Sequence, residues 1–151
     1  MPNEFREVQS ITMKRKHISL TGDDQYGHWW LEIGNPMDAT SESYGWWPQA
    51  PVGYAGTFAG VLGELNGQTN FGGTATRDPH HGDDADEEFH PLVPISDIRT
   101  DAEIEKCIRT FANGYGGTWQ WVFGKGQNCH TFQAASMKHC RLVKRAPKGW
   151  I

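Results

Sequence analysis

The segment that most restricts how this chain can fold is a glycine-rich turn that leads directly into an amphipathic helix. It begins at Gly124 and reads GKGQNCHTFQAASMKHC. Asn128 is a good N-cap, so the helix is expected to begin at Cys129. Its inward face is expected to hold Phe132, Ala135, Ser136 and Cys140. A thiol at the first helical position lies beside unpaired backbone N–H groups and the positive end of the helix dipole, which favour the thiolate and lower its pKa.

A β-hairpin is expected in the N-terminal third of the chain. Residues 10–20 alternate weakly and predict a first strand or a lead-in to one. The stretch GHWWLEIG, from Gly27, has aromatic and branched residues between two glycines, which is typical of a strand. The stretch ESYGWWP, from Glu42, predicts the returning strand, and Pro36 and Asp38 lie in the turn between them.

The middle of the chain predicts a long loop followed by a second helix. From Gln49 to Pro94 the sequence is rich in glycine and acidic residues and has little periodicity, with room for one short strand or helical turn. A loop of this length usually carries function or mobility. A helix is expected after Ser96, capped by Ser96 or Thr100. One face of this helix holds Ile104, Cys107, Ile108 and Phe111.

Length and composition favour one α+β domain over residues 1–151. The chain of 151 residues is long enough to bury a core, and its seven Trp and eighteen Gly favour short strands and tight turns over a helical bundle. We therefore expect a small antiparallel sheet packed against the helix that carries Cys129.

Charge and hydropathy exclude several classes of protein. The formal net charge of −4 has the wrong sign for general nucleic-acid binding. No run approaches the roughly 20 apolar residues that a membrane span needs, and the N-terminus has no apolar core of a signal peptide. We expect a soluble protein that is cytoplasmic where it is made, and secretion into target cells by a signal-less route stays open.

The three cysteines are expected to be reduced. Their odd number and the expected reducing cytosol argue against a disulfide framework. Free cysteines are among the most buried residue types, so Cys107 and Cys140 are expected to be core thiols on the two helices.

The Cys129 thiol needs an imidazole partner to act as a nucleophile at neutral pH. Seven histidines are available. His130 is adjacent, but neighbouring helical residues point about 100° apart, and His139 lies several turns away. His28 interrupts an aromatic strand in which an imidazole is otherwise unusual. A strand packed beside the helix can direct this ring at the sulfur, so His28 is the better candidate.

At these residues the chain resembles a known family. The run from Asn128 to Phe132 is similar to the Asn-Cys-x-x-Phe signature of circularly permuted papain-like enzymes. This group includes the PPPDE peptidases, the lecithin-retinol acyltransferases and the permuted NlpC-type amidases. In it a strand histidine precedes the cysteine helix, as His28 precedes Cys129. The resemblance covers two short blocks around an unmatched middle, and it implies a papain-like fold in circularly permuted order.

The resemblance implies a role for each matching residue. Cys129 is the expected nucleophile, and His28 is the expected general base and then general acid. The backbone N–H of Cys129 is one expected oxyanion donor, with Gln127 and Asn128 as helpers.

The strand after the histidine strand is expected to supply a third catalytic residue, as it does in some relatives. It offers Glu42, Ser43 and Tyr44, of which Glu42 and Tyr44 share a face. We favour Glu42, because a carboxylate both orients an imidazole and stabilises its cation. Tyr44 is an expected substrate-binding residue, and so are Trp30 and Trp46 from the two Trp pairs, which are expected to be half core and half groove wall.

A rival site lies in the stretch RDPHHGDDADEEFHP. Its residues of metal-binding type are His80, His81, Asp83, Asp84, Asp86 and His90. Their spacing fits neither an EF-hand loop nor an HExxH helix. We therefore expect no metal and no cofactor, and we expect this loop to flank the cleft and to recognise substrate or an inhibitor.

Together these features predict a cysteine peptidase that hydrolyses a peptide or isopeptide bond in a protein target. The chain's size, its lack of a secretion signal and its Trp- and Gly-rich loops resemble those of small effector toxins that bacteria inject into competitors. In that case a cognate immunity protein should plug the cleft. Three alternatives stay open: a peptidoglycan amidase or endopeptidase effector, a non-catalytic aromatic-rich binding module, and a metal-dependent hydrolase.

Overall fold

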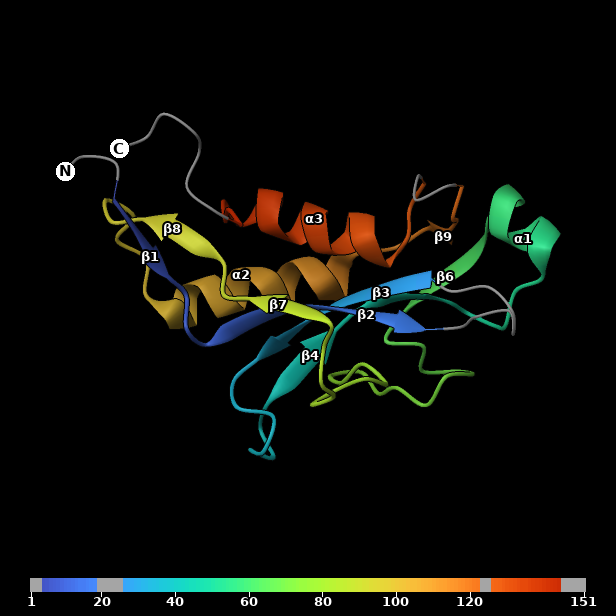
Figure 1. Ribbon diagram of the computed structural model, residues 1–151, viewed down its shortest axis with the longest axis horizontal. Helices are drawn as coiled ribbons and strands as arrows, with labels where there is room; N and C mark the ends of the chain where they lie inside the picture. Colours follow the sequence, from blue (N-terminus) through green and yellow to red (C-terminus); the bar gives the residue numbers. More distant parts are fainter. Residues whose placement is uncertain (1–3, 19–25, 123–125, 145–151) are drawn as a thin grey trace.

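The computed structural model describes residues 4–18, 26–122 and 126–144, and it has a mixed α+β fold (Figure 1). Within these ranges, three helices accompany small antiparallel sheets. The helices are α1 (Tyr54–Ala59), α2 (Asp101–Gly114) and α3 (Cys129–His139). The strands are β1 (Phe5–Glu7), β2 (Ile11–Ile18), β3 (Tyr26–Ile33), β4 (Glu42–Tyr44), β5 (Trp46–Pro48), β6 (Val61–Leu65), β7 (Glu87–Phe89), β8 (Leu92–Pro94) and β9 (Thr118–Trp119).

The central sheet has the strand order β4-β3-β2-β7, and it contains the expected hairpin. Because side chains alternate along a strand, its two faces differ in chemistry. The face toward the helices is apolar and includes Met13, Leu31, Ile33 and Tyr44. The opposite face is polar although it is buried, and it includes Lys14, His28, Glu32 and Ser43. The face on which a candidate site residue lies therefore decides whether it can contact His28.

Helices α2 and α3 run side by side over the apolar face of the sheet (Figure 1). Thr100 caps α2 in a capping box with Glu103, as one of the two predicted caps. Asn128 caps α3 as predicted, by accepting hydrogen bonds from the His130 and Thr131 N–H groups. Phe132 is completely buried in the core between the layers. Within the described ranges, none of the helices is both long and apolar enough to cross a bilayer.

The segment ESYGWWP does not form one strand, because the chain changes sheet at Gly45. β4 stays in the central sheet, whereas β5 joins a second sheet in the order β5-β6-β9. The stretch from Gln49 to Pro94 holds more regular structure than predicted, namely α1, β6, β7 and β8. In the stretch TWQWVFG, from Thr118, the residues Thr118–Trp119 form β9, and the last two residues lie outside the described residues.

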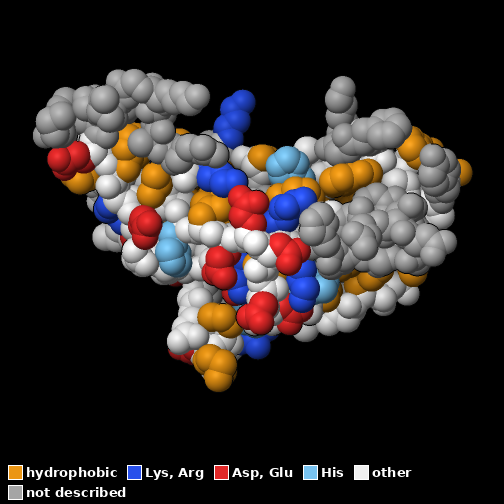
Figure 2. All heavy atoms as spheres, viewed as in Figure 1, with side chains coloured by type: hydrophobic (Ala, Val, Ile, Leu, Met, Phe, Trp, Pro, Cys, Tyr) orange, Lys and Arg blue, Asp and Glu red, His pale blue; other side chains and the backbone are white. Residues whose placement is uncertain are grey.

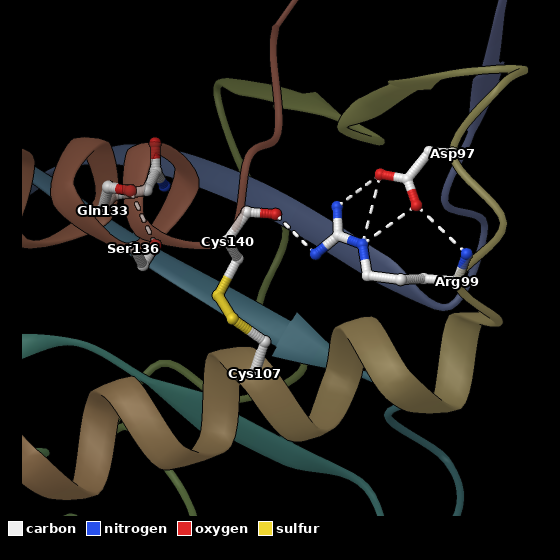
Figure 3. The surroundings of a disulfide bond; sticks show 6 residues. All are labelled: Asp97, Arg99, Cys107, Gln133, Ser136 and Cys140. Carbon is white, nitrogen blue, oxygen red and sulfur yellow. Dashed lines mark hydrogen bonds and ion pairs between the residues drawn. A yellow bond between two sulfur atoms is a disulfide. The ribbon is translucent and has the colours of Figure 1, made fainter.

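The expectation of core thiols at Cys107 and Cys140 is wrong, because these residues form a disulfide (Figure 3). Their Cα atoms lie 5.9 Å apart where α2 packs against the end of α3. An odd number of cysteines prevents complete pairing but not the pairing of two of them. Cys129 is the free cysteine. Beside the bridge, Arg99 donates a hydrogen bond to the Cys140 carbonyl oxygen and forms an ion pair with Asp97 (Figure 3).

Removing this disulfide is expected to lower the free energy of unfolding by about 3–4 kcal/mol, because the bridge closes a loop with a sequence separation of 33 residues. Dithiothreitol should therefore lower the urea midpoint of the wild-type protein. The Cys107→Ala/Cys140→Ala double variant should not respond to it, whereas Cys129→Ala should respond like the wild type. An equal midpoint with and without reductant in the wild type would contradict this expectation.

Candidate active site

The structure brings Cys129 and His28 together, as the sequence predicts. The Cys129 side chain is close enough to the His28 imidazole to interact with it electrostatically. Its sulfur also lies 3.5 Å from the Gly27 carbonyl oxygen, one residue before His28. β4 pairs only with Leu31–Ile33 of β3, so this neighbouring strand does not extend to His28. The N-terminus of α3 reaches β3 at this uncovered stretch.

The other side of the His28 ring contacts a carboxylate that the sequence did not single out. Nε2 of His28 lies 3.1 and 3.2 Å from the two carboxylate oxygens of Asp78. His28 and Asp78 are each 2% exposed, and Cys129 is 5% exposed. The three side chains form a buried thiol–imidazole–carboxylate chain.

The charges of His28 and Asp78 stabilise each other. Burial alone lowers the pKa of His28, because it disfavours the charged imidazolium. The charge and hydrogen bond of Asp78, followed by the contact with Cys129, more than offset burial and raise the pKa of His28 to about 10. Burial raises the pKa of Asp78, but the charge and hydrogen bond of His28, followed by hydrogen bonds from Trp47 and His80, lower it below its usual value. At neutral pH the His28 imidazole beside the sulfur is therefore positively charged.

Asp78 is held from several directions, although it lies in a loop. Its carboxylate also accepts hydrogen bonds from the Trp47 indole at 2.7 Å and from the His80 backbone N–H at 2.8 Å. Its own N–H donates to the Ser43 hydroxyl at 2.7 Å. These contacts connect the loop to β5 and β4. They fix the carboxylate before any substrate binds, which is the condition for efficient electrostatic catalysis.

Two further side chains anchor the loop to the hairpin. Asn66, which has a left-handed backbone with φ of 62°, accepts the Gly45 N–H and donates to the carbonyl oxygens of Ser43 and Thr74. Arg77 donates to the carbonyl oxygen of Ser41 at 3.2 Å. The backbone that precedes Asp78 is therefore tied to β4 and to the turn before it.

Aromatic rings surround the His28 imidazole. Trp47 lies 4.4 Å away between ring centroids, His80 lies 5.3 Å away, and Trp30 stacks at 5.5 Å with an interplanar angle of 12°. His80 belongs to the loop that was expected to flank the cleft. Its Nδ1 lies 2.9 Å from an Asp83 carboxylate oxygen. The rings exclude water from the imidazole–carboxylate pair and strengthen its electrostatics.

Gly45 permits the close approach of the imidazole and the carboxylate. A Cβ atom on Gly45 would overlap Oδ2 of Asp78 and lie 3.2 Å from Cε1 of His28. Gly45→Ala is therefore expected to displace the pair, to destabilise the fold by about 1–3 kcal/mol and to slow alkylation of Cys129 at pH 6. Urea unfolding and mass spectrometry with iodoacetamide measure the two effects. Gly114→Ala is the matched control, because its Cβ would meet nothing within 4 Å. Equal behaviour of the two variants would contradict this role.

Glu42, the expected third catalytic residue, does not orient His28. The strand register pairs Glu32 with Ser43 and Ile33 with Glu42, so Ser43 shares the face of His28 and Glu42 lies on the opposite face. Both carboxylate oxygens of Glu42 instead bind Arg109 at 2.7 Å. The expectation that Glu42 and Tyr44 share a face is confirmed, because the Tyr44 hydroxyl donates to Glu42 at 2.6 Å.

The aromatic residues expected to bind substrate are buried. Tyr44 and Trp46 belong to the hydrophobic core, where the Trp46 indole donates to the Thr118 carbonyl oxygen. Trp30 is completely buried on the polar face, and its indole donates to Glu32. Trp29, by contrast, is only partly buried and stacks on His130 at 4.4 Å. Trp29 is therefore the better placed of these rings to contact a substrate.

The expected oxyanion helpers have other partners. The side-chain amide of Gln127 donates to the Gly116 carbonyl oxygen at 2.6 Å. The side chain of Asn128 caps α3 with its oxygen and donates to the carbonyl oxygens of Gln120 and Gly126. The Cys129 N–H, at the first helical position, has no partner within its helix and can serve as an oxyanion donor.

The histidines of the rival loop do not converge. His81 lies between the hydroxyls of Ser41 and Ser43, at 2.9 and 2.8 Å, and Nδ1 of His90 lies 2.8 Å from the Ile11 carbonyl oxygen. In the parts of the chain that the structure describes, no three side chains of metal-binding type gather as a metal site. The loop instead contributes Asp78 and His80 to the surroundings of His28.

Comparison with known proteins adds no assignment, because no family model, no curated protein and no solved structure matches this chain. The function is therefore inferred from the geometry of the site.

Proposed function

We propose that this protein is a cysteine peptidase or amidase in which Cys129, His28 and Asp78 form the catalytic triad. The observation that carries the proposal is the position of the His28 imidazole, which lies beside the Cys129 side chain and binds a buried carboxylate through Nε2. A nucleophile, a base and a group that orients the base are the parts that covalent hydrolysis requires. The order of histidine before cysteine, with the cysteine at a helix start, supports a papain-like arrangement in circularly permuted order.

Each residue has a defined part in the proposed reaction. The Cys129 thiolate attacks the substrate carbonyl carbon, and the Cys129 N–H stabilises the negative oxygen of the tetrahedral intermediate. The C–N bond then breaks, and the His28 imidazolium gives its proton to the leaving amine. His28, now neutral, takes a proton from water, whose oxygen attacks the thioester. Collapse of this second intermediate releases the acid and restores the ion pair. Asp78 keeps the imidazole oriented and stabilises its cation throughout.

Two substrates suit an effector with this chemistry. The first is a peptide or isopeptide bond in a protein of the recipient cell, with a cognate immunity protein as inhibitor. The second is an amide bond in a cell-wall peptide. The Cys107–Cys140 disulfide favours the second candidate, because disulfides persist in oxidising compartments such as the periplasm.

Expression in bacteria with and without an export signal tests both candidates. If the target is a cytosolic protein, the unexported wild type should stop growth, and mass spectrometry should find new protein termini that the Cys129→Ala variant does not produce. If the target is the wall, only the exported form should act, and new free amines should appear in purified peptidoglycan. Equal activity of Cys129→Ala would contradict the proposal and support a non-catalytic binding module.

A further inference from the structure

A pocket of about 370 Å³ lies beside the Cys129–His28 pair, between α3 and strands β2, β3 and β7. Its lining includes Arg15, Trp29, Glu87, Phe89, His130 and Lys144, and we call it the Arg15 pocket. Two of these residues directly follow the catalytic pair in sequence, since Trp29 follows His28 and His130 follows Cys129. On the face where α3 and β7 lie, hydrophobic, basic and histidine side chains are adjacent at the surface (Figure 2).

Among the residues that the structure describes, the Arg15 guanidinium forms no ion pair with a carboxylate. Its Nε is a buried side-chain nitrogen without a hydrogen-bond partner, and no hydrogen bond or ion pair among the described residues engages the group. Its central carbon instead lies 5.0 Å from the centroid of the Trp29 ring. Arginine normally binds carboxylates or phosphates through its fork of N–H donors. A buried N–H donor without an acceptor costs free energy, and a ligand that supplies an acceptor would remove this cost.

The other charges of the pocket are already committed. Lys144 forms an ion pair with Glu87 at 2.8 Å and lies over the Phe89 ring. The Lys14 ammonium lies on the opposite face of the sheet, where it binds Glu32 at 3.0 Å. Burial, and then the charges of Arg15 and Lys144, lower the pKa of His130, so its imidazole is neutral at pH 7. The unpaired positive charge in the pocket is therefore that of Arg15.

Gly27 lies between the Arg15 guanidinium and the Cys129 sulfur. Its carbonyl oxygen lies 3.5 Å from the Cys129 sulfur. On its other side, a Cβ atom would overlap the Trp29 ring and lie 3.2 Å from Nε of Arg15. Gly27 thus lies between the thiol and the guanidinium. When a substrate carbonyl is at the sulfur, the neighbouring substrate residue is close enough to reach the pocket.

We propose that the Arg15 pocket binds a carboxylate carried by the substrate beside an apolar group, on the residue next to the carbonyl that Cys129 attacks. This inference rests on the proposed function and names the class of its substrate. The guanidinium binds the carboxylate, while Trp29 and Phe89 contact the apolar group. The carboxylate comes from a chain terminus or from an acidic side chain.

Matched alkylating reagents test this proposal. Iodoacetyl-phenylalanine carries a carboxylate, and iodoacetyl-phenylalaninamide differs only by having a carboxamide. In both, the Cys129 thiolate forms a C–S bond at the CH₂ group, and iodide leaves with the electrons of the C–I bond. We expect the carboxylate reagent to modify the wild type about tenfold faster than the carboxamide. Iodoacetyl-isoglutamine, which has its carboxylate on the side chain, distinguishes the two sources, and a preference for either carboxylate supports the pocket.

Substitutions of Arg15 assign the preference to this residue. Arg15→Gln should abolish it, so that the carboxylate and carboxamide reagents modify Cys129 at equal rates. Arg15→Lys should keep part of the preference, and Lys106→Gln, an exposed cation of α2, should keep all of it. Rapid reaction of Cys129 with no preference, or with a preference that Arg15→Gln leaves intact, would overturn the inference alone. Absence of selective reaction with all three reagents would overturn the proposed function as well.

Discussion

Replacing His28 by Gln is expected to slow alkylation of Cys129 by iodoacetamide at pH 6 by about 10²-fold. In the wild type the imidazolium lies beside the sulfur and stabilises the negative charge that the sulfur carries as it attacks, and glutamine has no charge to replace it. Loss of the proposed general acid and base should also remove hydrolysis, and Cys129→Ala should have the same effect. Liquid chromatography with mass spectrometry of the modified peptide gives the rate.

The control for this experiment is His139→Gln. His139 is exposed on the same helix and does not contact the thiol, so its variant should react like the wild type. Circular dichroism and the intact Cys107–Cys140 disulfide verify that the His28→Gln variant is folded. A folded His28→Gln variant that reacts as fast as the wild type would show that the imidazole does not activate the sulfur.

Asp78→Asn is expected to remove the charge interaction between residue 78 and His28 while the side chain keeps its shape. Asparagine removes the charge that counteracts burial, so the pKa of His28 should fall from about 10 toward the low value that burial favours. The imidazole then loses its proton at neutral pH. Alkylation of Cys129 at pH 6 should slow by about tenfold or more, and the pH at which alkylation begins should rise. The fall in the rate of hydrolysis at high pH should begin at a lower pH than in the wild type. The reason is that His28, the proposed general acid, loses its proton at a lower pH.

The same substitution changes how stability depends on pH. The folded-state pKa of His28 lies above its ordinary value of 6.5, so its stabilising contribution is complete below pH 6.5 and is lost as the pH rises toward 10. Asp78, whose pKa is lowered, contributes above its ordinary pKa of 3.8 and loses this contribution at lower pH. Asp78→Asn should therefore flatten the fall in stability between pH 7 and 10, as urea unfolding measures. A wild type without such a fall would contradict the coupling.

The central elements of the fold could be predicted from local sequence. The aromatic strand from Gly27 and the helix from Cys129 carry strong signals, since periodicity and an N-cap residue are read within a few neighbours. The partnership of Cys129 with His28 was predicted because few histidines lie on a strand that can pack beside that helix. It rested on the types of the two residues rather than on their separation in sequence.

Asp78 could not be predicted in the same way. It lies in a loop without periodicity, and its place is fixed by contacts with Ser43 and Trp47 that depend on the complete fold. The sequence offers only an Asp-Pro pair, which is typical of any turn. Among the residues of the adjacent strand, Glu42 was favoured because a carboxylate orients an imidazole and stabilises its cation. Strand register, which reverses the facing of every side chain when it shifts by one residue, places it on the other side of the sheet.

The disulfide was missed for a related reason. Cys107 and Cys140 lie on two helices whose relative position depends on how both pack on the sheet. A count of cysteines carries no information about this packing. The same holds for Arg15, which shares one face of β2 with Ile11 and Met13. Its position under Trp29 is visible only once β2 and β3 are paired.

The most direct test of the catalytic triad is an NMR titration of the His28 imidazole in the wild type and in Cys129→Ala. We predict that the wild-type ring stays protonated at neutral pH and titrates near pH 10, and that its pKa falls in Cys129→Ala because the thiol contact is lost. A titration at or below about 6.5, the same in both proteins, would contradict the account. It would show that His28 is an ordinary or neutral buried histidine and that the thiol acts without it.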